Sequence, residues 1–432
     1  VQAFAVGGEV GRPPGSWGEP GVVAERAQVA FAGASGLASM RLEPGTWRIV
    51  VSRGFEHEIV VQEVALAAGA TERVIADLER SVDTTGVMCA DYHIHTTRSP
   101  DADDDARVKI SSLVADGLEI AVRSEHEFVA DFDPVVQELG LGAFAIGLAG
   151  EELTTFQWGH FGVFPLEVDD SRPSGGAPRW PGRLPPDVFA EVRAMAGDPT
   201  LIINHPRTGG TAMGYFNAAG YDADTGMISR MDHWDESFTV VEVFNDSSFD
   251  ENRDRTVADW FSLLRHGRRV FAIGSSDSHH IHSAPVGYPR TCLALGTDDP
   301  RSITPAQVRD ATAEGRSVIS GGIYLEVTAE GGVGPGGEVT GSPERAPISV
   351  TVRAASWVDV DQLEVIVDGV VVETIPIAAT TNVVRLDDVT IEAPIAAPGS
   401  FVVLVASGDE ELEPVHRGRM PFAVSNPIFF RR

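Results

Sequence analysis

The chain has little of several residue classes that mark common protein types. Only 33 of its 432 residues are Lys or Arg, against 63 Asp or Glu, which gives a formal net charge of −30. No Lys/Arg cluster is present that could neutralise backbone phosphates, so the composition argues against long nucleic acid as a partner. No apolar run approaches the roughly 20 residues needed to cross a bilayer, so no transmembrane segment is predicted.

Cysteine is also scarce. Cys89 and Cys292 are the two in the chain, and their spacing indicates neither a C-x-x-C motif nor a disulfide framework. Both lie in apolar, strand-like runs, where a buried free thiol is the expected state. The first residues after Val1 lack the pattern of a signal peptide. A removed leader would favour an extracytoplasmic or periplasmic location, and the sequence otherwise leaves compartment and oligomeric state unknown.

Two catalytic signatures are absent as well, the Gly-x-Ser-x-Gly elbow and the Walker phosphate loop. What the chain does have is His93 and His95 in a strand-like run. Side chains alternate along a strand, so these two imidazoles face the same way and can hold one metal ion. Any single residue of this kind can have an ordinary structural role. Further residues of ligand type, however, follow most of the later apolar runs: Asp101, His126, Glu152, His160, His205, Asp277 and His279.

The pattern of apolar runs and turn residues divides the chain into three segments. Residues 1–81 contain short apolar runs separated by turn residues, which predicts an N-terminal β domain. Its expected strands cover 28–32, 38–42, 47–52, 58–66 and 72–78. Residues 326–432 return to alternating runs, with a hairpin signal at Val367-Asp368-Gly369-Val370 and a Gly-rich stretch at 331–341 that looks like a linker. An immunoglobulin-like β-sandwich is the economical interpretation of this last segment.

The middle segment, 82–325, alternates strands with helices. Helices are expected at 106–115, 134–139, 185–196, 256–266 and 305–315, each preceded by a short apolar strand. Strand, ligand loop and helix in repetition are typical of a parallel β/α barrel whose reactive groups gather at one rim. The ligand-type residues would then meet in space although they lie far apart in sequence.

These motifs resemble those of the polymerase-and-histidinol-phosphatase (PHP) family of metal-dependent hydrolases. The arrangement of a β module before and another after the barrel is most similar to the carbaryl-hydrolase-like (CehA/McbA) branch. The resemblance implies a distorted (β/α)7 PHP barrel that holds two or three divalent metal ions, Zn, Mn or Fe. The stretches that carry it are Asp91-Tyr92-His93-Ile94-His95-Thr96, Ser124-Glu125-His126, Gly150-Glu151-Glu152, Asn204-His205-Pro206 and Ser276-Asp277-Ser278-His279.

Carried over residue by residue, the resemblance implies three metal positions. The first would be held by His93, His95, Glu152 and Asp277. A bridging Glu152 with His160 and His205 would hold the second, and Asp101, His126 and His279 the third. Some family members carry His where this chain has Asp101. If Asp101 points away from the cluster, the site would hold two metals.

Mixed imidazole and carboxylate ligands without thiolate suit Zn, Mn or Fe. A hydroxide shared by two such ions is a nucleophile at neutral pH. The chain is therefore predicted to be a metallohydrolase acting on a small-molecule ester, first a phosphoesterase for phosphomonoesters, phosphodiesters or phosphotriesters. A carbamate, carboxyl ester or amide hydrolase is the alternative that the nearest branch implies. A non-catalytic metal- or sugar-binding surface protein is the third, and the complete set of ligand types argues against it.

Substrate and supporting residues are predicted from the same loops. Arg207 follows a ligand motif and could grip a substrate anion with two parallel hydrogen bonds, although pairing with a structural carboxylate is equally expected. Arg98 and Arg290 are weaker candidates for the same role. Glu242 and Asn245, at the end of another expected strand, could orient a ligand histidine.

Overall fold

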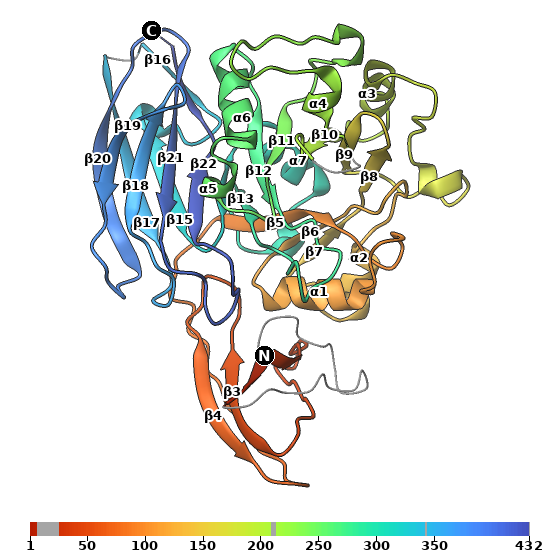
Figure 1. Ribbon diagram of the computed structural model, residues 1–432, viewed down its shortest axis with the longest axis vertical. Helices are drawn as coiled ribbons and strands as arrows, with labels where there is room; N and C mark the ends of the chain where they lie inside the picture. The colour runs from red at the N-terminus through yellow and green to blue at the C-terminus, as the bar shows by residue number, and fades with distance from the viewer. Residues whose placement is uncertain (7–25, 209–212, 342–343, 432) are drawn as a thin grey trace.

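The computed structural model describes residues 1–6, 26–208, 213–341 and 344–431, and the chain folds as a mixed α/β protein with many strands and few helices (Figure 1). The N-terminal strands project from the body of the molecule, while the middle and C-terminal segments lie against each other. Within the described ranges no helix has both the length and the apolar character to cross a membrane.

The N-terminal module is a four-stranded antiparallel sheet in the order β2-β1-β3-β4. The strands predicted at 38–42 and 72–78 are wrong, because neither range pairs with a neighbour. Their apolar residues, among them Met40, Leu42 and Val74, pack against the small core around Trp47 instead. The strands are β1 (Gln2–Ala5), β2 (Arg26–Val29), β3 (Gly45–Val51) and β4 (Val60–Leu66).

Two sheets form the middle segment. β5, β6 and β7 pair in parallel, as do β10, β11 and β12, whereas β8, β9 and β10 are antiparallel. The expected alternation of strand and helix is therefore interrupted where β8 and β9 form a hairpin. The strands are β5 (Val87–Ile94), β6 (Ile120–Arg123), β7 (Ile146–Leu148), β8 (Glu151–Thr155), β9 (Gly159–Phe164), β10 (Thr200–Asn204), β11 (Val240–Asn245), β12 (Phe271–Ser275), β13 (Arg290–Ala294) and β14 (Ser317–Ser320).

The predicted helices of this segment are confirmed with small shifts at their ends. Asp105 caps the first of them, because its carboxylate accepts from the backbone N–H groups of Arg107 and Val108. The helices are α1 (Ala106–Ala115), α2 (Asp133–Glu138), α3 (Pro185–Arg193), α4 (Tyr215–Ala219), α5 (Phe249–Asn252), α6 (Thr256–Arg265) and α7 (Pro305–Ala313).

The C-terminal segment is built of strands. The predicted hairpin is confirmed, since Val367 pairs with Val370 across a turn in which Asp368 and Gly369 both have positive φ. The stretch 331–341 is not a plain linker, because β16 pairs in parallel with β23. The strands are β15 (Tyr324–Ala329), β16 (Glu338–Thr340), β17 (Arg345–Arg353), β18 (Gln362–Val367), β19 (Val370–Pro376), β20 (Val384–Pro394), β21 (Ser400–Ser407), β22 (Phe422–Ser425) and β23 (Ile428–Arg431).

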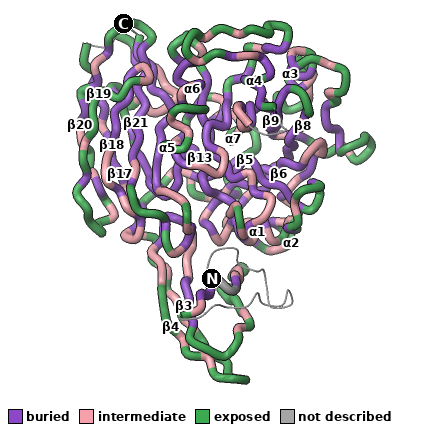
Figure 2. The backbone as a smooth tube through the Cα atoms, in the orientation of Figure 1, coloured by how far each residue is buried: buried purple, intermediate pink, exposed green. Residues whose placement is uncertain are grey.

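The middle and C-terminal segments share one core. β14 pairs with β22, so the sheet that begins at β7 continues into the C-terminal strands. A single cluster of buried apolar side chains extends through both segments, and Figure 2 shows buried residues across them while β4 of the N-terminal module is largely exposed. The C-terminal strands are thus part of the body that carries the middle segment.

The expectation of two free thiols is wrong, because Cys89 and Cys292 form a disulfide. The two residues are 203 positions apart in the chain. They lie directly opposite each other only because β13 pairs with β5 in this register. Spacing along the sequence therefore held no sign of the bond.

We predict that this disulfide stabilises the fold. Replacing both cysteines by Ser should lower the free energy of unfolding by about 2–4 kcal/mol, because the bond constrains the unfolded chain. Denaturant unfolding of the double variant and the oxidised parent measures the difference. Thiol titration of the unfolded, unreduced parent is the control, and two free thiols there would contradict the assignment.

A second prediction concerns Glu119, beside the junction with the N-terminal module. Its carboxylate accepts from the Cys89 N–H at 2.9 Å. Burial raises the pKa of the Glu119 carboxyl to about 8, and the nearby Glu56 carboxylate adds to the rise. Because folding raises the pKa of this carboxyl, the fold loses stability as pH increases, here between the ordinary pKa of 4.5 and about 8.

Glu119→Gln should therefore gain melting temperature over the parent as pH rises from 5 to 8, since the amide keeps an acceptor without titrating. Thermal unfolding at several pH values measures the gain. The exposed Glu63→Gln serves as control, and a constant difference across the range would contradict the prediction.

Candidate metal centre

Side chains of the predicted ligand types converge at one edge of the two middle sheets. β5, β6, β10 and β12 run parallel toward this edge, and His95, His126, His205 and Asp277 follow directly after them. β9 runs antiparallel to β10 and so begins at the same edge, where its His160 lies. Loops at one edge of the sheets thus bring together residues far apart in sequence.

Glu152 lies at the centre of this cluster and is fully buried. Its Oε1 is 3.0 Å from Nε2 of His93, 3.2 Å from Nε2 of His205 and 3.3 Å from Nδ1 of His160. Its Oε2 is 2.9 Å from Nδ1 of His126 and 3.8 Å from Nε2 of His95. One carboxylate therefore faces five imidazoles from four different strand ends, because His93 and His95 both belong to the end of β5.

Asp277 is the second carboxylate of the cluster. Its Oδ1 lies 3.2 Å from Nε2 of His93, 3.3 Å from Nε2 of His95 and 3.4 Å from Nδ1 of His279. The residue has φ of +49°, a conformation that costs energy for a side chain with a Cβ. The backbone is held there by Ser278, whose N–H donates to the His93 carbonyl.

Asp101 completes the set from a more open position. Its side chain is 56% exposed, and Oδ2 is 3.2 Å from Nε2 of His126 and 3.5 Å from Nε2 of His279. All nine predicted ligands therefore lie in one connected cluster, and Asp101 forms its outer side.

Glu242 and Asn245 lie behind the cluster. Oε1 of Glu242 is 2.8 Å from Nδ1 of His93, so an Nδ1–H donating to this carboxylate leaves the His93 Nε2 lone pair toward Glu152 and Asp277. The amide of Asn245 donates to both Glu242 and Asp277, at 3.0 and 3.1 Å. The structure also places Glu242 near enough to His93 and His205 to join them as a ligand.

The donor atoms fit a divalent metal. Nε2 of His93, Nε2 of His95, Nδ1 of His160 and Oδ1 of Asp277 are buried and make no hydrogen bond. Nitrogen and oxygen ligands each about 2 Å from one ion lie roughly 3.4 Å apart, close to the separations observed here. The groups whose donor atoms lie within 4.8 Å of one another are His95-His126-His279, His93-His205-Glu242, His93-His95-Glu152 and Glu152-His160-His205.

Mutual electrostatics keep the carboxylates charged. Burial works against charge on Glu152, yet the His93 and His160 imidazoles hold the pKa of its carboxyl well below the usual range. Burial likewise opposes charge on Asp277, and His93 lowers the pKa of that carboxyl well below its ordinary value. Both side chains are thus ionised at neutral pH, as metal ligands must be.

Arg207 does not reach toward a substrate in this structure. Its guanidinium pairs with Asp259 through two hydrogen bonds of 2.8 and 2.7 Å, and it also donates to the Tyr221 carbonyl. Asp259 is almost fully buried, so releasing this arginine would leave a buried charge unpaired. The structural pairing that the sequence equally allowed is the one observed.

The two other arginine candidates differ from each other. Arg290 is fully buried and pairs with Asp116 at 2.7 Å, so it has a structural role. Arg98 is exposed, with its guanidinium carbon 3.5 Å from the centre of the Phe128 ring. It follows closely after His95, which leaves Arg98 as the one of the three open to a solute.

Sequence reasoning missed Lys109, which is fully buried in α1. Its Nζ donates to the Ser278 carbonyl at 2.9 Å and hydroxyl at 2.8 Å, and pairs with Asp104 at 3.0 Å. Ser278 lies between the candidate ligands Asp277 and His279, so this ammonium fixes the loop that carries both. A signal was present, because Lys109 occupies the apolar face of α1 next to Ile110 and Leu113.

Comparison with known proteins adds little. No family model and no curated protein matches the chain. One similar solved structure is a two-domain protein containing a predicted PHP-like metal-dependent phosphoesterase from Bacteroides vulgatus ATCC 8482. It is 14% identical, with a TM-score of 0.37, over 84% of this chain and 100% of that chain. A likeness this weak carries no argument about the fold or the function of this chain.

We predict that Lys109 is needed for metal binding as well as for stability. Lys109→Met should weaken zinc binding about 10–100-fold, the usual effect of losing a residue that supports a ligand. Zinc content after dialysis, and competition with a chelator, measure the change.

Arg290→Met is the matched control, because it removes an equally buried cation paired with an aspartate away from the cluster. Both variants should lose stability, while only Lys109→Met should lose metal. Equal zinc retention in the two would refute the role given to Lys109.

Proposed function

We propose that the chain is a metal-dependent hydrolase of the PHP type, in which two or three Zn, Mn or Fe ions are held by the nine clustered residues. The observation that carries the proposal is the convergence of six imidazoles and three carboxylates on one site, with buried donor atoms that make no hydrogen bond. Without a metal, each of these buried atoms that lacks a hydrogen bond would reduce the stability of the fold.

Divalent ions held there would supply Lewis acidity and a water activated for attack at neutral pH. The chain itself fixes the ligands. Glu242 sets the tautomer and direction of His93, and Asn245 holds Asp277 against it. Glu152, shared among several imidazoles, is the residue suited to bridge two ions.

Phosphoester hydrolysis is the first candidate reaction, because a cluster of several ions suits in-line displacement at phosphorus. Hydrolysis of a carbamate, carboxyl ester or amide is the second, and one observation favours it. Arg207, the guanidinium expected to grip a phosphate, is committed to Asp259. Arg98 at the exposed side remains available to an anionic substrate.

We also propose the module division at 1–81, 82–325 and 326–432, with a distorted barrel between an N-terminal β domain and an immunoglobulin-like sandwich. The separate four-stranded sheet at the N-terminus supports the first boundary, whereas β15 crosses the second, at 325/326. The Cys89–Cys292 disulfide supports an extracytoplasmic location, since such bonds persist in oxidising compartments.

We predict that the purified protein contains at least two divalent ions per chain and hydrolyses an ester. Elemental analysis gives the metal content. Matched p-nitrophenyl phosphomonoester, phosphodiester, phosphotriester and carboxyl ester substrates then assign the reaction. Treatment with a chelator should abolish turnover, and added metal should restore it.

Asp277→Asn should lose more activity than the roughly 10–100-fold typical of a supporting residue. Asp388→Asn is the matched control, because Asp388 also has positive φ but lies far along the chain in the C-terminal strands. Full activity of Asp277→Asn, or turnover that resists chelation, would refute the proposal. Tightly bound metal without any turnover would favour the non-catalytic alternative.

A further inference from the structure

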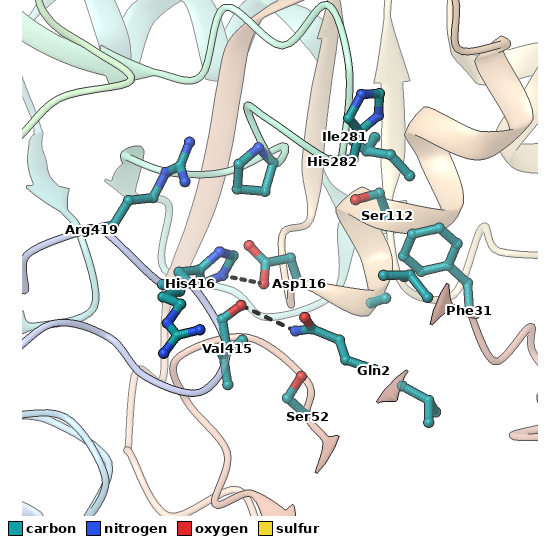
Figure 3. A pocket seen from close by; sticks show the side chains of 15 residues that line it. Gln2, Phe31, Ser52, Ser112, Asp116, Ile281, His282, Val415, His416 and Arg419 are labelled. Carbon is teal, nitrogen blue, oxygen red and sulfur yellow. Dashed lines mark hydrogen bonds and ion pairs between the residues drawn. The ribbon is translucent and has the colours of Figure 1, made fainter. Parts of the chain in front are cut away.

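The C-terminal strands send one loop to the middle segment, between β21 and β22. Tyr288 donates its hydroxyl to the Met420 carbonyl at 2.7 Å, and His416 lies 3.0 Å from Asp116. Figure 3 shows Arg419 and His416 from this loop in one view with Asp116 and His282 of the middle segment. The loop therefore lies on the same side of the middle segment as the residues that follow His279.

Arg419 of this loop contacts Asp246 and Ser283 of the middle segment. Its Nε and Nη2 donate to Oδ1 of Asp246 at 3.0 and 2.7 Å, and Nη2 also lies 3.0 Å from Oδ2. Nη2 donates in addition to the Ser283 carbonyl at 2.8 Å. One guanidinium, whose side chain is 16% exposed, thus joins two loops of the middle segment.

Both loops lead directly to the candidate metal centre. Asp246 follows Asn245, whose amide donates to Asp277, and the Asp246 N–H donates to the Ser275 carbonyl just before that ligand. Asp246 has φ of +41°, so its backbone must be held in place by its surroundings. Ser283 lies four residues after His279 on the other loop.

We propose that Arg419 is a positioning residue for this centre, so that the C-terminal module completes the site instead of merely packing beside it. This role of the C-terminal module rests on the proposed metal-dependent function. Arg419 fixes the Asn245–Asp246 turn and the loop after His279, and through them it fixes the carboxylate of Asp277. Lys109 holds the same loop from α1.

A purely structural tether between the segments is the competing explanation, and the chain offers one for comparison. Arg253 of the middle segment pairs with Glu364 on β18 at 2.7 Å and with Asp250 of α5 at 2.9 Å, and neither partner belongs to the two loops. Arg253→Met removes an ion pair across the same boundary. Arg419→Met removes one that also touches the loops.

Hydrogen exchange of the metal-free protein provides the first test. Arg419→Met should raise exchange in 244–247 and 276–285, while Arg253→Met should leave these segments as in the parent. Asp246→Asn, a milder change to the same contact, should raise exchange in the same segments if Arg419→Met fails to fold. Unchanged exchange in the folded variant would overturn the inference.

Titration with Zn²⁺ provides the second test. Arg419→Met should bind zinc about 10–100-fold more weakly than the parent, and Arg253→Met should bind as the parent does. Equal weakening in both variants would make the contact a tether and overturn the inference. A parent that binds no zinc would overturn the proposed function, and hydrogen exchange would still decide whether Arg419 holds the loops.

Discussion

The buried carboxylate of Glu152 is the constraint on which the middle of the molecule depends. Removing a lone carboxylate from water is costly, so its burial requires compensation from several directions. Imidazoles from four different strand ends supply it. The backbone bears part of the cost, because His205 and Asp277 both have positive φ. Conformations of this kind persist only where their surroundings hold them, and two of the candidate ligands adopt one.

Local pattern was enough to predict α1, α2, α3, α6 and α7 but not the short α4 and α5, and the ligand set was predicted from the resemblance to the PHP family. α1 covers the predicted residues because its apolar positions and its Asp105 cap are both local signals. The convergence of the ligands followed from residues placed after successive strands. Long-range pairing was beyond reach. Arg207 meets Asp259 from 52 residues away, and Cys89 meets Cys292 only through the register of β5 and β13. The apolar residues at 38–42 alternate because they pack against the core of the N-terminal module. Periodicity alone does not distinguish such packing from pairing in a strand.

The two flanking modules relate to the body in different ways. The N-terminal sheet has its own small core around Trp47 and pairs with no strand of the middle segment among the described residues. The C-terminal strands share both a sheet and an apolar core with the middle segment. The C-terminal module is therefore continuous with the middle segment through paired strands, whereas the N-terminal module reaches the β21–β22 loop through Gln2 and Phe4, which contact Val415. This difference is why a positioning role is assigned to Arg419 of the C-terminal module.

Charge connects the centre to its substrate. A chain with a formal net charge of −30 repels anions, so an anionic substrate would need a positive site to approach. The ligand set contributes three carboxylates, Asp101, Glu152 and Asp277, while its six imidazoles are neutral as ligands. With three carboxylates, two divalent ions would leave the site a net charge of +1, and three ions would leave it a net charge of +3. If Glu242 also binds, two ions would only balance the carboxylates. In the proposed metallohydrolase, the number of ions would therefore decide whether the site attracts a phosphate ester or accepts an uncharged ester.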